Sequence, residues 1–501
     1  PPYQLHHPHQ IAMADVDPRD MEVPMATRET PQEQNDNVIK ELLDRPYINK
    51  RTGLDFVVMC VMGFILGLLS IPYCAGVEDI PKFWLRFFGP AGFVEDNMEL
   101  SSKNLYRRGA GLWILLCWGF CTAVGILKVL LKLDKYPSFI DELKHQHVDP
   151  WVNLKVVVCC IASLGAGAVM GLEAGLGSVG AALGFHLWKL IEKVLPSEND
   201  TLRDQRRRIY ILAGLAGAFG TIFPAPVVSV ILVSEIATAG TEHSTSEEEH
   251  FMTGRRLPKK VFFYLVPAAI SAFCTRTWQI PPPHPPSYYG REDYKDLSVF
   301  IGLALGVIAA VAVVIFLLLG ALIKAIFSLV GTPLERRFGT PTRQIVAASM
   351  AGLITGVMIY LFPLACGSGK DGMMPTMTLT FDKQISVPYL IGLAIAKVVA
   401  YWACAHGGLV GGIFYPLLYY GLTLGEICQQ VFKIDALVAL PVMIGATPGA
   451  LLPAPITALA FPVCMFVTGP TQTVPILTAI VIANAILVGS GFLEKMMSRK
   501  Q

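Results

Sequence analysis

A single carboxylate stands inside a long apolar stretch of this sequence. Glu173 lies in the segment Gly171-Leu-Glu173-Ala-Gly175, and no basic residue occurs within ten positions of it on either side. An isolated carboxylate in such surroundings is costly to bury and therefore marks a functional position by default. A structural alternative is a glutamate that accepts hydrogen bonds from amides freed by the neighbouring glycines. The functional interpretation is a protonatable side chain at the mouth of an anion path, where its charge competes with the anion for helix N-terminal amides.

A second stretch, Gly411-Gly412-Ile413-Phe414, has glycines just before an expected helix start. Glycine lets a solute approach the backbone closely, and the amides of Ile413 and Phe414 would then point at it. Peptide amides attract an anion without a full positive charge that would trap it. Close helix packing through small residues is the alternative. We predict that amides and glycines from both stretches bind an anion, namely Gly171, Ala174, Gly175, Gly412, Ile413 and Phe414.

The two stretches belong to one repeated pattern. Three glycines of the first half recur 241 residues later: Gly171, Gly180 and Gly184 correspond to Gly412, Gly421 and Gly425. A second pair of segments follows, Gly220-Thr-Ile-Phe-Pro224-Ala-Pro226 and Gly449-Ala-Leu-Leu-Pro453-Ala-Pro455. Gly and Pro breaks at matching places in two apolar halves are typical of transporters with a substrate site at the repeat interface. Unwound backbone at membrane depth is tolerated only where it is buried or lines a cavity.

Composition places the elements that carry these residues in a membrane. The 501 residues are 53% apolar and only 16% charged, with a mean hydropathy of +0.52, and soluble domains carry more charge than this. No ionisable residue occurs from Ala436 to Leu493, which is long enough for two crossings of roughly 20 residues each. Six further apolar runs cover residues 56–71, 109–127, 156–187, 209–233, 299–323 and 345–364. We predict an all-α, multi-pass integral membrane protein.

Several function classes are excluded or disfavoured. The net charge of +2 gives no indication of nucleic-acid binding, and basic clusters at the ends of apolar runs read as interfacial anchors. The eleven cysteines form no CxxC pair and are expected to be buried thiols. No Ser/His pair, paired aspartates or HExxH motif indicates an enzyme. We expect no metal site and no cofactor, and a structural role for His406.

The chain divides into five segments. Residues 1–52 form a polar, flexible tail; 53–278 a first membrane repeat; 279–297 a Pro-rich loop; 298–497 a second membrane repeat; and 498–501 a short basic tail. No soluble domain is expected after the second repeat. The chain does not begin with Met, and this favours a removed or omitted leader and an organelle membrane.

From about residue 54 to 497 the sequence resembles the CLC family of chloride channels and proton-coupled chloride transporters. Gly171-Leu-Glu-Ala-Gly175 is similar to the family's G-[KR]-E-G-P segment, with Glu173 at the gating position, and Gly412-Ile-Phe-Tyr-Pro416 matches G-x-F-x-P. Lys397, Pro224-Ala-Pro226 and the stretch Thr457 to Gly469 also have counterparts in order. The resemblance implies two inverted-topology repeats of tilted and broken helices, chloride as the transported ion, and a homodimer with one pore in each subunit. The segments near 261–274 and 456–488 would form its interface. The chain is expected to be a divergent member of the family without a CBS domain pair.

The sequence departs from the family pattern at positions that bear on mechanism. Where the family has G-S-G-I-P-E, this chain has Pro137-Ser138-Phe139, so Ser138 is retained as an anion ligand while Phe139 narrows the inner path. Leu172 replaces a basic residue, and no tyrosine follows Tyr420 to coordinate the central anion. Proton-coupled members carry Glu-Glu where this chain has Glu235-Ile236, and an isoleucine cannot carry a proton.

We therefore expect a passive CLC-type anion channel, selective for chloride or a similar small anion, in the lipid bilayer. Glu173 would gate it, and Ile236 marks the replaced proton position. Two alternatives stay open. Loss of the Ser138-flanking glycines favours a degenerate, non-conducting subunit of a larger membrane assembly. Retention of Glu173, with a possible one-residue slip of the alignment near Glu235, favours a chloride/proton antiporter.

Overall fold

The computed structural model describes residues 50–88, 111–133, 148–197, 200–239, 260–279, 298–452 and 454–489. Within these ranges the secondary structure is helical throughout, apart from one pair of bridged residues. The part from Arg51 onward forms one compact unit. Among the described residues, seven helical stretches are long and apolar enough to cross a membrane, and several shorter apolar helices accompany them. The prediction of an all-α polytopic membrane protein is confirmed.

The first half of the described chain holds ten helical elements. They are α2 (Lys50–Cys74), η1 (Ala75–Asp79), α3 (Ile80–Phe88), α4 (Leu112–Leu130), α6 (Pro150–Gly165), α7 (Glu173–Val194), α8 (Asp200–Gly220), α9 (Pro226–Ala239), η4 (Val261–Leu265) and α11 (Val266–Gln279). The second half holds α12 (Ser298–Phe338), α13 (Thr340–Leu361), η5 (Pro363–Ala365), α14 (Lys370–Phe381), α15 (Val387–His406), α16 (Phe414–Phe432), α17 (Ala436–Gly449), α18 (Pro455–Phe466), α19 (Pro470–Asn484) and η6 (Ala485–Gly489).

The duplication seen in the sequence is also a duplication of helix boundaries. Helix α6 ends 241 residues before α15 ends, and α7 begins 241 residues before α16 begins. Two residues after the end of α6 and of α15 stands a glycine with positive φ, Gly167 at 90° and Gly408 at 73°. The next amide then bonds back into the helix, Ala168 N to Ser163 O at 3.1 Å and Leu409 N to Cys404 O at 3.0 Å. Such glycine caps end a helix and turn the chain, so both halves break at the same place.

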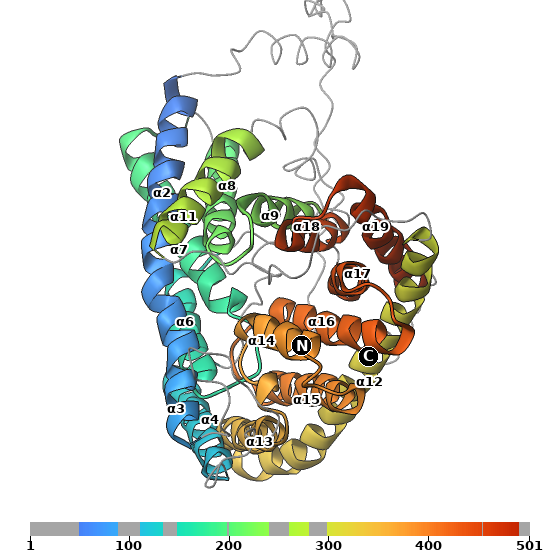
Figure 1. Cartoon of the computed structure of the whole chain (residues 1–501). Coiled ribbons are helices and arrows are strands. Elements are labelled where there is room, and N and C mark those ends of the chain that lie inside the picture. Colours follow the sequence, from blue (N-terminus) through green and yellow to red (C-terminus); the bar gives the residue numbers. More distant parts are fainter. Residues whose placement is uncertain are drawn as a thin grey trace, which may run out of the picture. The chain divides into compact units, whose positions relative to one another are not determined.

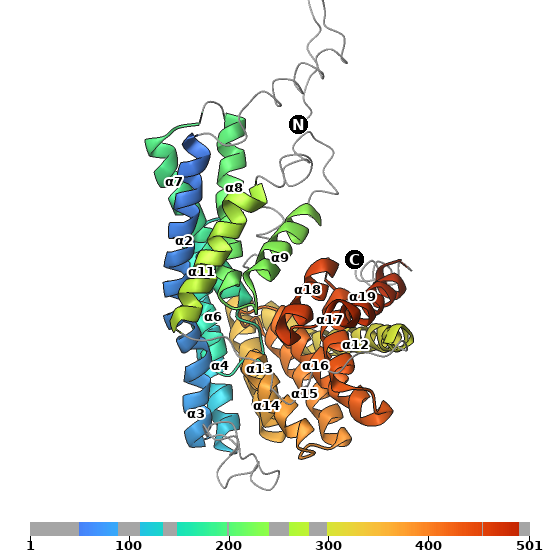
Figure 2. The same ribbon diagram turned by 45° about the horizontal axis from the view of Figure 1, so that its top comes forward.

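The two halves are joined along several helix pairs. Figure 1 shows α4 of the first half beside α13 of the second, and α9 beside α18, and both pairs are in contact. In the turned view of Figure 2, α2, α7, α8 and α11 run side by side, while α14 to α19 gather in the other half of the fold. Two ion pairs also connect the two halves. Lys370 pairs with Glu78 and Lys82 pairs with Asp371, both at 2.8 Å.

Four of the repeated glycines pack helices together. A side chain on Gly180 or Gly184 of α7 would run into the backbone of α8, at Gly214 and Tyr210. In the second half, Gly421 and Gly425 of α16 lie equally close to the backbone of α17. Because a glycine lets two helix backbones approach closely, the α7–α8 and α16–α17 pairs are held rigidly. For these four glycines the close-packing interpretation is the one that the structure bears out.

The outer face of several helices is apolar and exposed. Leu115 and Trp118 of α4, Leu154 of α6, and Phe300 and Leu318 of α12 all expose large hydrophobic side chains. In a soluble protein such a surface would be a liability, whereas in a bilayer it faces the lipid chains. All eleven cysteines are free thiols and most of them are buried, as expected.

Candidate functional site

Two non-helical segments, one just before α7 and one just before α16, meet in the interior of the fold. Gly171 and Gly412 form an antiparallel bridge, with Gly171 N donating to Gly412 O at 2.8 Å and Gly412 N donating to Gly171 O at 2.7 Å. Helix α7 begins two residues after Gly171, and α16 begins two residues after Gly412. Because the pairing is antiparallel, the chain runs in opposite directions through the two repeats at this point. The pairing also brings the N-termini of α7 and α16 together in the interior. Such N-termini attract negative charge.

Glu173 places its carboxylate at this junction. It is the first residue of α7 and only 1% exposed. Its Oε1 accepts a hydrogen bond from the backbone N of Tyr415, in the first turn of α16, at 2.7 Å. Its Oε2 is buried with no hydrogen-bond partner in the described part of the chain. The carboxylate of one repeat therefore occupies the helix N-terminus of the other, where an anion would otherwise bind.

The amides next to Tyr415 have room for a further acceptor. Within the described ranges, the backbone N–H groups of Ile413 and Phe414 have no hydrogen-bond acceptor, as is usual for the first residues of a helix. Phe414 is 1% exposed, so water from the protein surface does not reach it freely. The structure thus brings together Glu173 and the amides of Ile413 and Phe414, and it adds Tyr415 as the amide that Glu173 contacts.

Glycine is required at residues 171 and 412 because the Glu173 carboxylate occupies the space beside them. A Cβ added to either glycine would collide with the Glu173 carboxylate. If that carboxylate moved away, the same space would become available to a small solute. Gly175 differs, because its missing side chain makes room for the hydroxyl of Tyr73 and for Cys160. Gly175 is therefore close to the site without facing it, and Ala174 is buried beside Glu173 in α7.

A tyrosine from the first helix holds the segment before Glu173. The hydroxyl of Tyr73 in α2 donates to the carbonyl of Leu172 at 3.0 Å, and its oxygen lies 3.3 Å from the Sγ of Cys160. Leu172, which stands where a basic residue was the family expectation, is fully buried. The local environment is accordingly apolar, with the partial charges of peptide groups as its main electrostatic feature.

Aromatic side chains line one side of the junction, a feature that was not predicted from the sequence. Phe223 lies in the loop between α8 and α9, with ring centroids 5.3 Å from Phe414 and 5.9 Å from Phe461 of α18. The Tyr415 ring is 6.4 Å from Phe461, and its hydroxyl donates to Ile222 O. We call Phe223, Phe414, Tyr415 and Phe461 the aromatic wall. Phe223 and Phe414 both belong to repeated segments, which was the available signal.

Two buried ionisable side chains lie elsewhere in the second half. Lys397 of α15 is fully buried and donates to Ala365 O at 3.0 Å and Gly367 O at 2.9 Å. Its Nζ is 4.7 Å from the ring centroid of Tyr419. Glu426 of α16 is fully buried too, and the Thr380 hydroxyl faces its carboxylate. Neither was assigned a role from its sequence position.

The Glu235-Ile236 pair is arranged as a helix cap beside a packed aliphatic residue. Glu235 of α9 accepts from Ile456 N and Thr457 N at 2.8 Å each and from the Thr457 hydroxyl at 2.6 Å. These donors belong to the first turn of α18, where a carboxylate is stabilised. Ile236 is 1% exposed and has no polar atom in its side chain. The side chain of residue 236 therefore cannot bind or release a proton.

Several predicted positions lie outside the described residues. These are Ser138 and Phe139, the tails before residue 50 and after residue 489, and nearly all of the Pro-rich loop. His406 is described: it stacks on Trp402 with ring centroids 5.4 Å apart, and its Nε2 lies 3.2 Å from Gly320 O. The described side chains contain no group of three or more metal-binding residues.

Comparison with known protein sequences and structures identifies similar proteins. The sequence model of the family described as voltage gated chloride channel matches residues 118–487. The YfeO protein of Escherichia coli strain UMN026, whose name assigns it provisionally to ion transport, is 23% identical over 287 residues. That match covers 56% of this chain and 59% of the relative's length.

Two solved structures have a similar fold. A slow cyanobacterial Cl⁻/H⁺ antiporter has a TM-score of 0.67 at 18% identity, covering 90% of this chain and 99% of its own. A CLC-type fluoride/proton antiporter has a TM-score of 0.59 at 16% identity, covering 86% and 95%. At these identities the similarity concerns the fold.

Proposed function

We propose that this chain, which belongs to the voltage-gated chloride channel (CLC) family of anion-transporting membrane proteins, passes chloride or a similar small anion through the junction of its two repeats. Transport is passive, Glu173 is the gate, and no cofactor takes part. The anion replaces the Glu173 carboxylate at the start of α16 and accepts hydrogen bonds from the amides of Ile413, Phe414 and Tyr415. Ser138 contributes a hydroxyl to the anion.

The observation that carries this proposal is the bond between Glu173 Oε1 and Tyr415 N at 2.7 Å. A carboxylate held at a helix N-terminus by a hydrogen bond from the Tyr415 amide, with its second oxygen lacking a hydrogen-bond partner in the described structure, is a removable occupant of an anion site. Gly171 and Gly412 leave the space that an anion needs once the carboxylate has moved. Amide dipoles bind an anion weakly enough to release it, as conduction requires.

The aliphatic side chain at residue 236 favours passive conduction over anion/proton exchange. Its side chain is aliphatic and buried, and the adjacent carboxylate of Glu235 is already engaged by three donors of α18. The second candidate, anion/proton exchange, is favoured by a different observation: Glu426 supplies another fully buried carboxyl group on α16, the helix that begins at the anion site.

A liposome experiment separates these functions. The purified chain is reconstituted in vesicles loaded with chloride, and anion efflux and internal pH are followed together. Passive conduction predicts chloride efflux without proton uptake against a pH gradient. Uphill proton movement driven by chloride, lost in Glu426→Gln, would favour the exchanger. No efflux with chloride, nitrate or fluoride would favour a non-conducting subunit of a larger assembly.

We also propose a homodimer with one path in each subunit. Exposed apolar side chains lie on the helices expected at the interface, including Ile456 of α18 and Val474, Leu477 and Val481 of α19. Phe262 and Ile270 extend the same kind of surface on η4 and α11. Light scattering of the detergent-solubilised protein, corrected for bound detergent, measures the mass and tests this state.

A further inference from the structure

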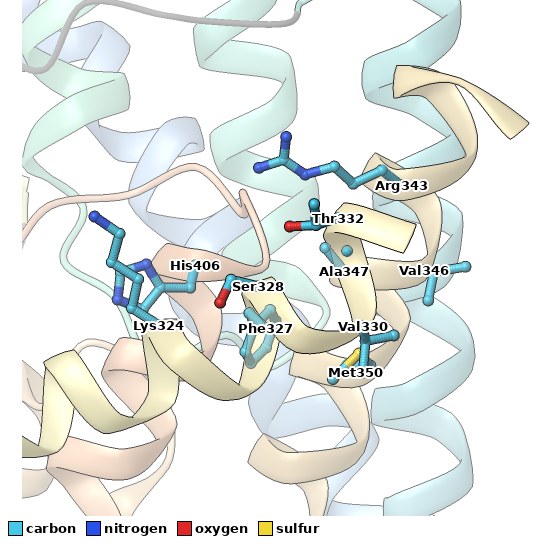
Figure 3. A pocket seen from close by; sticks show the side chains of 11 residues that line it. Lys324, Phe327, Ser328, Val330, Thr332, Arg343, Val346, Ala347, Met350 and His406 are labelled. Atoms are coloured by element: carbon cyan, nitrogen blue, oxygen red, sulfur yellow. The ribbon is translucent and has the colours of Figure 1, made fainter. Parts of the chain in front are cut away.

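A cavity of about 170 Å³ lies away from the repeat junction, between α12, α13 and the end of α15 (Figure 3). It forms because Gly339, with a φ of 84°, separates α12 from α13 and lets the chain reverse direction. Arg343 thereby returns alongside α12 at Gly331, where an added Cβ would lie 3.5 Å from its Nε. None of the residues proposed above to bind the transported anion lines this cavity.

The cavity combines basic, hydroxyl and apolar groups. Lys324 and His406 lie together at one end and Arg343 at the other, with the hydroxyls of Ser328 and Thr332 between them. Its apolar lining is contributed by Phe327, Val330, Val346 and Met350. A ligand that fits this lining has a compact anionic group with several acceptor oxygens, attached to an apolar portion.

The charges around the cavity leave a positive excess. Lys324 is exposed and has no acidic partner among the described residues. Arg343 is already paired, since its Nη1 donates to Glu335 Oε2 at 2.7 Å. Arg336 and Arg337 follow at the end of α12. Glu335 therefore balances one of these four positive charges, and an anion is the missing partner.

The position of the cavity near the C-terminal end of α12 indicates its depth in the membrane. Lys324, Ser328 and Thr332 are spaced by four residues and form one polar row on the helix. An exposed apolar row, formed by Val311, Ile315, Leu318, Leu322, Ile326 and Leu329, runs along the opposite side of the helix. With 41 residues, α12 is about 61 Å long, about twice the hydrocarbon thickness of a bilayer. Its basic end therefore reaches the headgroup region while its apolar row faces acyl chains.

We propose that this cavity binds an anionic glycerophospholipid. The headgroup phosphate lies among the basic and hydroxyl groups of the cavity, and the adjoining part of the acyl chains packs on its apolar lining, Phe327, Val330, Val346 and Met350. Basic pockets between membrane helices bind lipid phosphates in this way. A free phosphate would use the same polar groups but would leave the apolar lining of the cavity without a partner, so the lipid is the better match.

Native mass spectrometry of the detergent-purified full chain tests the proposal with three probes. These are phosphatidylglycerol, phosphatidylcholine with the same acyl chains, and inorganic phosphate. We expect phosphatidylglycerol to be retained in preference to both others. Lys324→Gln should weaken its retention at least about fivefold, because each basic residue near an anionic lipid contributes on that scale. The matched control Lys193→Gln, an exposed lysine at the end of α7, should leave retention unchanged.

A second variant tests the cavity independently of its charge. Ser328→Phe keeps all basic groups and fills the space with a ring, so it should also abolish preferential retention, while an unchanged melting midpoint shows that the fold is intact. Equal retention of phosphatidylcholine, binding of inorganic phosphate as tight as that of the lipid, or equal losses in the two lysine variants would each overturn the proposal.

Discussion

The Glu173 carboxylate and the Tyr415 backbone amide lie 2.7 Å apart, although 242 residues separate them in the sequence. One belongs to the first turn of α7 and the other to the first turn of α16, which are equivalent helices of the two repeats. This contact closes the junction with a group from the protein itself. It makes each repeat part of the binding site of the other, so neither half would form the site alone.

Glycine at residue 412 is predicted to be required for this contact. Gly412→Ala places a methyl group against the Glu173 carboxylate, and overpacking of this kind costs about 1–3 kcal/mol. The melting midpoint should fall accordingly. The double variant Gly412→Ala/Glu173→Ala should recover most of the loss because the colliding group is gone. Simple additivity of the two single effects would show that the collision is not the cause.

Lys397 is predicted to support the fold near η5 and α14. Lys397→Met removes the donor for the Ala365 and Gly367 carbonyls and leaves them buried without that bond, at a cost of about 1–3 kcal/mol. Thermal unfolding in detergent measures the effect. Lys193→Met, at an exposed position, serves as the control and should change stability by less than about 0.5 kcal/mol. Equal melting midpoints for the two variants would contradict this assignment.

Glu235 is predicted to act as a cap of α18 and to take no part in transport. Glu235→Gln keeps the shape but loses the charge at a helix N-terminus, so a loss of about 1 kcal/mol in stability is expected. Anion flux in liposomes should stay within about twofold of wild type once equal protein incorporation is verified. Abolished flux in a folded Glu235→Gln protein would mean that the carboxylate lies on the transport route.

The aromatic wall is predicted to restrict the path. Phe223→Ala removes a ring that contacts both Phe414 and Phe461, which should lower stability by about 3–5 kcal/mol and raise the rate of anion flux per folded molecule. Phe219→Ala is the matched control, since Phe219 belongs to α8 and stacks on Phe223 with ring centroids 5.8 Å apart. A faster flux in both variants would attribute the effect to loosened packing.

The helical membrane fold was predictable because length and hydropathy act locally. Apolar runs with few charges need nothing but a bilayer to become helices, and the repeat of Gly171 and Gly412 indicated the junction. The same residue type also packs helices, however. Gly180, Gly184, Gly421 and Gly425 share the 241-residue spacing yet serve contacts with α8 and α17, and spacing alone does not separate the two uses.

Details of the site depended on three-dimensional geometry. Glu173 contacts the amide of Tyr415, one residue beyond the two amides predicted for the anion, because the carboxylate reaches past the bridge into the first turn of α16. The aromatic wall joins residues more than 200 positions apart, Phe223 and Phe461, which no local pattern connects. The cavity beside α12 could not be predicted for another reason: Arg343 of α13 lines it only because the chain reverses direction at Gly339.

Chloride efflux from proteoliposomes containing wild type or Glu173→Ala tests the gate most directly. Removing the carboxylate vacates the start of α16, and a charge-assisted hydrogen bond of about 1.5–3 kcal/mol no longer competes with the anion. We expect at least about tenfold faster efflux in Glu173→Ala at equal incorporation. Identical efflux from the two proteins, with the variant correctly folded, would contradict it.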